Sequence, residues 1–262
     1  MNVNDFQRRK QQGIKISMLT CYDYWTARIL NKTDVDCLLV GDSLAMVVHG
    51  YESTVHATVE MMAMHISAVK RGAPDKFIVG DMPFLSCSKG LEAAMDAVQA
   101  LMQAGASAVK IEGAEHQTEI IKHIVEAGVP VMGHIGLTPQ SIHALGGHRV
   151  QGKNEEKARE LCKSAAKLAE AGCFSLVMEC VPLKLAGKIS QSIPIPTIGI
   201  GAGPDVDGQV LVLQDLIGAD GDFKPRFLRH YADSDGLLQE AVNHFHRDVT
   251  ELAFPALEES YQ

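Results

Sequence analysis

The segment FIVGDMPF (residues 77–84) reads as a buried strand that ends in an aspartate, with Met-Pro directly after it. The segment LLVGDSL (38–44) repeats the pattern, because Gly41 and Asp42 close its apolar run. Short continuous apolar runs of this kind are typical of fully buried strands. Two strands that both end in Gly-Asp need a common explanation, and we expect Gly41 and Gly80 to keep the approach to each aspartate clear.

Apolar runs of strand length alternate with amphipathic runs of helix length along the sequence. Seven runs are clear strand candidates and the last is weaker: 16–21, 37–42, 76–81, 108–113, 130–136, 174–180, 195–201 and 209–215. Helix patterns lie between them, as in 58–71, 90–105, 115–128 and 154–172. Eight β-then-α units predict an α/β protein with a closed (β/α)8 TIM barrel. A doubly wound open sheet is the alternative, although it usually has fewer strands and a Gly-rich first turn.

The chain has 262 residues, about the length of one such barrel. We find no linker, so we expect a single barrel domain over 1–262, with a short amino-terminal extension and carboxy-terminal helices. The net charge of −8 argues against binding to nucleic acid. The polar first residues do not resemble a signal peptide, and no run approaches the roughly 20 apolar residues that span a membrane. The six cysteines form no C-x-x-C pair, which favours reduced thiols in the cytoplasm.

Five ionisable residues fall at or near the carboxyl ends of the predicted strands, which is where a (β/α)8 barrel collects its active site. They are Asp42, Asp81, Glu112, His134 and Glu179. An aspartate at a strand end often caps the next helix instead, and this interpretation stays open for Asp42. It is weaker for Asp81, because a proline two residues later favours extended backbone at the residue between them.

The alternation of side chains indicates which of these groups point into the barrel. In 108–113, Lys110 and Glu112 share the face opposite the apolar residues. In 174–180, Ser175 and Glu179 share one face, and Phe174 belongs to the set that faces the helices. Since the helix-facing side must be apolar, we expect Lys110, Glu112 and Glu179 inside the barrel. An internal ion pair between Lys110 and Glu112 is the simpler alternative.

These residue types indicate a particular chemistry. Two or three carboxylates at strand ends suit a hard cation such as Mg²⁺. A nearby lysine complements an anionic substrate, and a further carboxylate is available as a base. The histidines lack metal-site spacing, and a lone histidine such as His134 is more often structural. The pattern therefore favours enolate chemistry on a carbonyl acid.

Several long segments in the same order resemble one known family. They are VGDSLAMVVHGYEST, VGDMPF, VKIEGA, GHIGLTPQS, GGHRVQGK, ECVP and PTIGIGAGPDVDGQVLVLQDLIG. Together they are similar to the ketopantoate hydroxymethyltransferases over about residues 16–233. The sequence of residues 214–236 departs from the family pattern. The resemblance implies a Mg²⁺-dependent barrel of the phosphoenolpyruvate/pyruvate type. It also implies transfer of a one-carbon unit from 5,10-methylenetetrahydrofolate to 3-methyl-2-oxobutanoate, giving 2-dehydropantoate on the route to pantothenate and coenzyme A.

The resemblance also implies roles for single residues. Asp42 and Asp81 match direct metal ligands that also contact the substrate, and Glu112 matches a third metal-site carboxylate that acts through water. Ser43 and Lys110 match groups that hold the oxoacid.

For Glu179 the family match is the proton acceptor, whereas His134 lies in a family motif without an assigned role. The family implies a homo-oligomer, for which a decamer is one candidate.

Two other functions are weighed against this one. A Mg²⁺-dependent C–C lyase for 2-methylisocitrate-like acids would use a reactive loop cysteine, for which Cys87 is the candidate, although SCSKG (86–90) looks more like a helix start. A catalytically idle barrel that binds an oxoacid is the other. The intact set of acidic residues and Lys110 argues against it.

Overall fold

The computed structural model describes residues 1–219 and 225–261, so part of the atypical segment 214–236 lies outside the described residues. The contacts within the chain divide it into two units, Met1–Val212 and Leu213–Gln262. The predicted single domain over 1–262 therefore stays a prediction.

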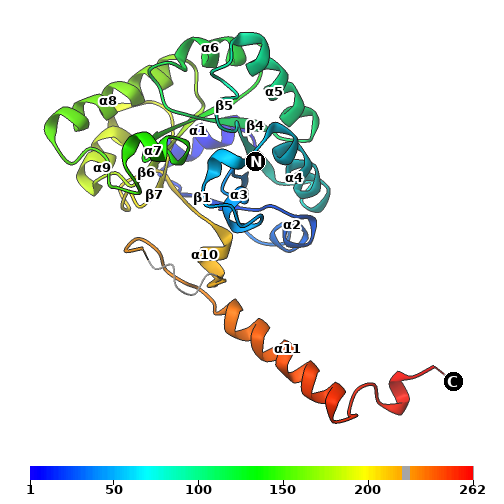
Figure 1. The fold of residues 1–262 in the computed structure, drawn as a ribbon. Helices are drawn as coiled ribbons and strands as arrows, with labels where there is room; N and C mark the ends of the chain where they lie inside the picture. The colour runs from blue at the N-terminus through cyan, green and yellow to red at the C-terminus, as the bar shows by residue number, and fades with distance from the viewer. Residues whose placement is uncertain (220–224, 262) are drawn as a thin grey trace. The chain divides into compact units, whose positions relative to one another are not determined.

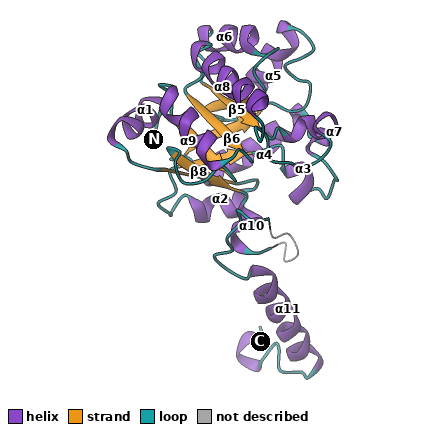
Figure 2. Cartoon of the chain, turned by 90° about the vertical axis from the view of Figure 1, so that its left-hand side faces the viewer, coloured by secondary structure: helices purple, strands orange, loops and turns teal. Residues whose placement is uncertain are grey.

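The first unit contains a closed barrel in which each strand pairs in parallel with the next and the last pairs with the first. The strands are β1 (Ile16–Thr20), β2 (Cys37–Val40), β3 (Phe77–Asp81), β4 (Ala108–Glu112), β5 (Val131–Gly136), β6 (Ser175–Glu179), β7 (Thr197–Ile200) and β8 (Gly208–Leu211). Figure 2 shows these strands in orange, inside a layer of helices. The predicted (β/α)8 barrel is confirmed.

Helices follow the strands in the order that the sequence predicts (Figure 1). In the first unit they are α1 (Val3–Gln12), α2 (Tyr24–Leu30), α3 (Leu44–Val47), α4 (Val59–Gly72), α5 (Leu91–Gln103), α6 (Thr118–Glu126), α7 (Ile142–Leu145), α8 (Glu155–Glu170) and α9 (Leu183–Ser192), with 3-10 turns η1 (Thr54–His56) and η2 (Pro139–Ser141). Two long helices begin at side-chain caps, since Thr58 accepts a hydrogen bond from the Met61 amide and Asn154 from the Lys157 amide.

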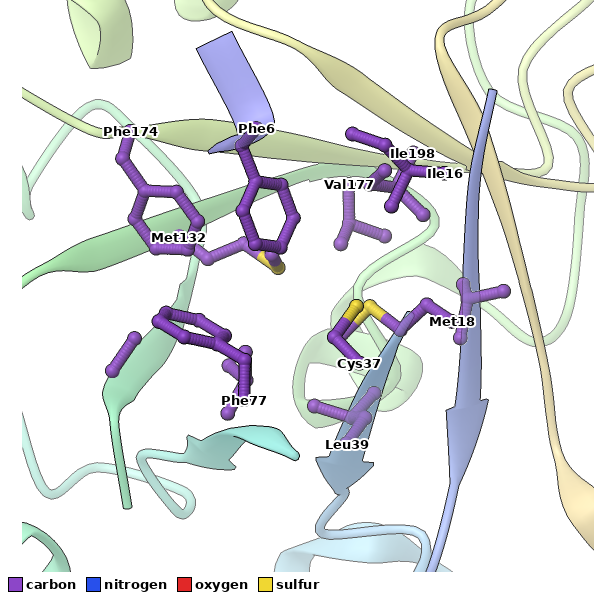
Figure 3. Packing of buried hydrophobic residues seen from close by; sticks show 13 residues of the cluster. Phe6, Ile16, Met18, Cys37, Leu39, Phe77, Met132, Phe174, Val177 and Ile198 are labelled. Atoms are coloured by element: carbon purple, nitrogen blue, oxygen red, sulfur yellow. The ribbon is translucent and has the colours of Figure 1, made fainter. Parts of the chain in front are cut away.

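Apolar side chains fill the amino end of the barrel. Phe6 of α1 is fully buried, and its ring centroid lies 5.4 Å from that of Phe77 and 5.1 Å from that of Phe174. Figure 3 shows the Phe6 ring beside these two phenylalanines, which we call together the floor cluster. The helix-facing position predicted for Phe174 is wrong: it precedes β6, so the alternation of that strand does not apply to it.

The second unit, Leu213–Gln262, contains α10 (Leu213–Ile217), α11 (Ser234–Thr250) and η3 (Leu257–Glu259). Asp233 caps α11 by accepting a hydrogen bond from the Gly236 amide. Several apolar side chains of α11 are exposed, among them Leu238, Val242 and Phe245. Within the described residues, the helices are too short or too polar to cross a membrane.

Candidate active site

The two aspartates of the Gly-Asp motifs meet at the carboxyl end of the barrel. Asp81 is the last residue of β3 and Asp42 follows β2, and both are buried. The Asp42 amide donates a hydrogen bond to Asp81 Oδ2 at 3.0 Å. The alternative that Asp42 caps a helix is not supported, because the residue before α3 is Ser43 and Asp42 Oδ2 accepts a hydrogen bond from Gln140 Nε2 at 2.8 Å.

The two glycines of these motifs have different roles. A Cβ atom at Gly41 would lie 2.8 Å from Ser43 Oγ and at an ordinary contact distance of 3.5 Å from Asp81 Oδ2, so this glycine makes room for the Ser43 hydroxyl, and its predicted role beside Asp42 stays a prediction. A Cβ at Gly80 would instead lie 2.6 Å from Cδ1 of Ile66. The predicted role of Gly80 is therefore wrong, since it makes room for the packing of α4 on β3.

Met82 continues the strand geometry beyond Asp81. The Met82 amide donates a hydrogen bond to the Lys110 carbonyl at 2.9 Å, so the pairing of β3 with β4 extends one residue past the aspartate. Pro83 then follows, and it disfavours helical backbone at Met82. This local geometry holds the Asp81 carboxylate at the barrel end rather than at a helix start.

Lys110 lies between two carboxylates inside the barrel. Its Nζ is 3.1 Å from Asp81 Oδ1 and 4.0 Å from Glu112 Oε1. His134 Nδ1 lies 3.2 Å from the same ammonium group and 3.3 Å from Glu112 Oε1. The neutral imidazole can accept a hydrogen bond from Lys110 at this nitrogen, whereas the protonated one donates to Glu112. The inward orientation predicted for Lys110 and Glu112 is confirmed.

His134 connects two acidic groups of the site. Its Nε2 lies 3.4 Å from Glu179 Oε2, while its Nδ1 faces Glu112. Burial and the Lys110 charge lower the pKa of His134, but its hydrogen bonds with Glu112 and Glu179 outweigh them, so the net shift is upward. The family resemblance implied no role for this histidine, and in the structure it lies between the two glutamates.

Negative charge is in excess at this end of the barrel. Burial, followed by repulsion from Asp81 and Glu112, raises the pKa of Asp42 well above its usual range. Burial also raises the pKa of Asp81, against the opposing effect of Lys110. Burial acts in the same direction on Glu112, but His134 and Lys110 reverse the sign and leave its pKa lowered. Crowded buried carboxylates of this kind favour a bound cation.

Tyr22 and Gln140 complete the site, and neither was predicted. The Tyr22 hydroxyl lies 2.8 Å from Ser43 Oγ, and burial raises the pKa of this tyrosine. The side-chain Nε2 of Gln140, in η2, donates hydrogen bonds to Asp42 Oδ2 and to the Met82 carbonyl. The backbone amide of Gln140 donates a hydrogen bond to Glu112 Oε2. Gln140 belongs to the segment GHIGLTPQS, so the family motif contained the signal for it.

One cavity of about 120 Å³ collects the predicted residues. Its walls include Asp42, Ser43, Asp81, Lys110, Glu112 and Glu179, together with Thr20, Thr54, His134 and Pro139. We call it the active-site cavity. Side chains as far apart in the sequence as Thr20 and Glu179 thus face the same small volume, as a barrel with its site at the strand ends requires.

The donor atoms of the cavity fit Mg²⁺. They are carboxylate oxygens, and those of Asp42 and Asp81 are buried, with the Lys110 ammonium 3.1 Å from Asp81 Oδ1. Within 1–219 and 225–261, no three His, Cys, Asp or Glu side chains form a complete metal cage. Mg²⁺ is usually held by one or two carboxylates, with water and substrate oxygens as the other ligands, so an incomplete set suits this ion.

Cys87 does not have the properties of a reactive thiol. It is buried in the turn before α5, and burial raises its pKa to about 11. A thiol with so high a pKa is almost entirely protonated at neutral pH and is a poor nucleophile. This argues against the lyase alternative, which needs a reactive cysteine.

Solved structures of low sequence identity share the fold. A phosphonopyruvate hydrolase in complex with oxalate and Mg²⁺ has a TM-score of 0.64 at 12% identity, and the match covers 99% of this chain and 93% of that one. A 2,3-dimethylmalate lyase, described as a member of the PEP mutase/isocitrate lyase superfamily, has a TM-score of 0.60 at 14% identity, covering 99% and 90%. These matches support the barrel fold.

Relatives of high sequence identity share a single name. The model of the ketopantoate hydroxymethyltransferase family matches residues 1–257. A 3-methyl-2-oxobutanoate hydroxymethyltransferase of Coxiella burnetii is 56% identical over 98% of this chain and 97% of its own length. One from Legionella pneumophila is 52% identical over the full length of both chains. The chain is therefore an enzyme that belongs to the ketopantoate hydroxymethyltransferase family.

Proposed function

We propose that the protein transfers a hydroxymethyl group from 5,10-methylenetetrahydrofolate to 3-methyl-2-oxobutanoate, giving 2-dehydropantoate for the synthesis of pantothenate and coenzyme A. The observation that carries this proposal is the active-site cavity, where acidic groups and a lysine from separate strands face one small volume. That volume suits a small oxoacid, and membership of the family indicates which one.

Asp42 and Asp81 would hold Mg²⁺ directly, with Glu112 acting through a water molecule. The ion supplies a Lewis acid that polarises the substrate ketone and favours negative charge on its oxygen. Gln140 positions this set, because it donates hydrogen bonds both to Asp42 and to Glu112. A bound dication would lower the raised pKa values of the two aspartates, since it would offset the negative charge of the neighbouring carboxylates.

Lys110 and Ser43 would bind the oxoacid. The Lys110 ammonium is buried at the cavity wall, where it offsets the negative charge that a substrate carboxylate brings in. The Ser43 hydroxyl is held by Tyr22 at 2.8 Å, so it is oriented before the substrate arrives. Groups that are held in place in this way lose little entropy on binding.

Glu179 would remove the proton from C3 of the oxoacid. Its side chain is 19% exposed, in contrast to the nearly inaccessible Glu112, so it borders the open part of the cavity. His134 holds this carboxylate from the barrel side through Nε2. The enolate carbon would form a bond to the methylene carbon of the folate donor as one of the two C–N bonds of that carbon breaks. Water would then replace the second nitrogen and supply the hydroxyl group. The proton taken by Glu179 and one proton from water would end on the two nitrogens of the released tetrahydrofolate.

Turnover assays test the proposal. We expect NMR to detect 2-dehydropantoate from the oxoacid and the folate donor, with the activity lost in EDTA and restored by Mg²⁺. The lyase alternative predicts cleavage of 2-methylisocitrate without folate-dependent transfer. An idle barrel predicts binding of the oxoacid without exchange of its C3 proton for deuterium. Either result would reject the proposed reaction.

We also propose that the enzyme is a homo-oligomer in the cytoplasm. Leu238, Val242, Phe245, Val249 and Leu252 follow one another at spacings of four and three residues, and each is at least 42% exposed. An apolar stripe with this spacing, on and just after α11, is typical of a helix that packs on another chain. Light scattering tests the proposal. A monomer at micromolar concentration would reject it, and a mass of ten chains would match the decamer.

A further inference from the structure

A second hollow adjoins the active-site cavity. It has a volume of about 510 Å³ and lies between residues 52–56, which include η1, and residues 139–148, which include η2 and α7. We call it the mouth groove. Thr54 and Pro139 line both the groove and the active-site cavity, so the two hollows share a wall at these residues.

Thr54 is an unpaired polar group at this shared wall. The residue is 3% exposed, and its Oγ1 atom is buried without a hydrogen-bond partner among the described residues. A buried hydroxyl without a partner costs free energy, so such groups are usually paired. The position of Thr54 between two hollows indicates that a ligand provides the missing partner.

The sizes of the two hollows differ in the way the proposed reaction requires. The active-site cavity of about 120 Å³ suits a small oxoacid. The mouth groove of about 510 Å³ is within the usual range of sites for molecules of several hundred daltons. The proposed reaction joins one substrate of each size, and the one-carbon unit of the larger must reach the C3 atom of the smaller.

The groove presents groups that suit a flat heteroaromatic molecule with an acidic tail. The His56 ring stacks on Tyr51 with the centroids 4.7 Å apart and the planes 17° from parallel. Ile142 provides an apolar wall, and the imidazoles of His143 and His148 can donate hydrogen bonds to carboxylates. Rings and hydrogen-bond donors together favour a pterin with its glutamate.

We propose that the mouth groove binds the reduced-pterin donor, with its one-carbon unit placed at Thr54 and Pro139. This inference rests on the proposed function, because it assigns the site of the second substrate. A polar atom of the donor forms a hydrogen bond with Thr54, and the donor contacts Ile142 at the wall of the groove.

Calorimetry with tetrahydrofolate in anaerobic buffer tests the groove. Ile142→Trp adds bulk inside it, and we expect the dissociation constant to rise at least tenfold. The matched control is Cys162→Trp, which adds the same side chain to another hollow of about 510 Å³ beside α8 and α9. We expect the control to bind like the wild type. Equal affinity of Ile142→Trp and wild type, or no binding to the wild type, would overturn the proposal.

Thr54→Val is the second variant, and it decides the question if Ile142→Trp does not fold. It removes the hydroxyl at nearly constant volume, and no hydrogen bond within the described protein is lost. We expect an unchanged melting temperature and a three- to tenfold weaker binding of tetrahydrofolate. Unchanged affinity would overturn the role of Thr54 and, with it, the proposed placement of the donor.

Deuterium exchange at C3 separates this inference from the proposed function, since it needs the oxoacid and the metal but no folate. A wild type without exchange would contradict the proposed enolate chemistry, whatever the result for tetrahydrofolate. Exchange in the wild type, combined with normal binding of tetrahydrofolate by Ile142→Trp, would overturn the mouth groove alone.

Discussion

At the amino end of the barrel, one oxygen of the Asp207 carboxylate accepts several hydrogen bonds, whereas at the carboxyl end the like charge of Asp81 acts on Asp42. Asp207 Oδ2 accepts hydrogen bonds from Lys10 at 2.7 Å and from the Thr197 amide at 2.8 Å. Burial raises the pKa of Asp207, but these partners outweigh it and the net shift is downward. The pKa values of Asp42 and Asp81 are shifted upward.

The difference shows how the fold separates stability from binding. The floor cluster and Asp207 close one end with satisfied contacts. The other end brings Asp42 close to the like charges of Asp81 and Glu112, and it keeps Thr54 Oγ1 without a hydrogen-bond partner among the described residues. Groups that weaken the isolated protein are tolerated where a ligand completes them. Variants at the two ends should therefore change different properties.

The largest effect is expected for Glu179→Gln. The variant keeps the shape of the side chain and removes its basic oxygen, so we expect C3 exchange to fall by about 10²–10⁴-fold. Binding of the oxoacid and Mg²⁺ should remain. NMR in D₂O measures the exchange, with Glu119→Gln on the exposed face of α6 as the control. A wild-type rate in Glu179→Gln would remove this residue as the base.

Phe6→Ala should have the next largest effect, and on stability alone. The ring is fully buried in the floor cluster, so its loss should lower the free energy of unfolding by about 3–5 kcal/mol. Urea unfolding measures this, and Phe6→Leu should lose much less. The Mg²⁺ concentration for half-maximal exchange should stay the same. A loss below about 1 kcal/mol would show that the floor cluster does not stabilise the barrel.

Asp81→Ala should change the metal requirement. Since it removes a direct ligand, we expect half-maximal C3 exchange to need at least about tenfold more Mg²⁺. Titration with Mg²⁺ measures this, with Asp96→Ala on the outer face of α5 as the control. An unchanged Mg²⁺ dependence would refute the ligand assignment.

Asp207→Asn should give the smallest effect, and one that depends on pH. Loss of the charged hydrogen bonds should cost about 1–3 kcal/mol at pH 7. The pKa of Asp207 in the folded protein is below its ordinary value of 3.8. The stabilisation is therefore complete at a pH above 3.8, and it is lost as the pH falls through the pKa of the folded protein. Urea unfolding at pH 7 and below pH 3 measures the difference between variant and wild type. A difference that does not change with pH would contradict the role of the charge.

The sequence was sufficient to predict the barrel fold and to predict which residues of its strands point inward. Strand alternation and the strand-end rule locate Lys110, Glu112 and Glu179, because both depend on regular backbone. Tyr22 and Gln140 lie outside the strands, where no period fixes the direction of a side chain. Phe174 was assigned wrongly for the same reason, since it lies one residue before β6.

The role of His134 could not be predicted because it depends on distances between strands. Its two nitrogens face carboxylates from β4 and β6, and this pairing follows from the register of β5 with both neighbours. A single sequence contains the alternation of each strand but not the register between them. The same limit applies to the mouth groove, whose walls come from segments more than 80 positions apart.

A crystal structure with 3-methyl-2-oxobutanoate and Mg²⁺ tests the central claim most directly. The account predicts one ion in the active-site cavity, with oxygens of Asp42 and Asp81 about 2.0–2.1 Å from it and the oxoacid beside Lys110. An ion bound elsewhere, or an oxoacid held in the cavity without contact between the ion and either aspartate, would contradict it.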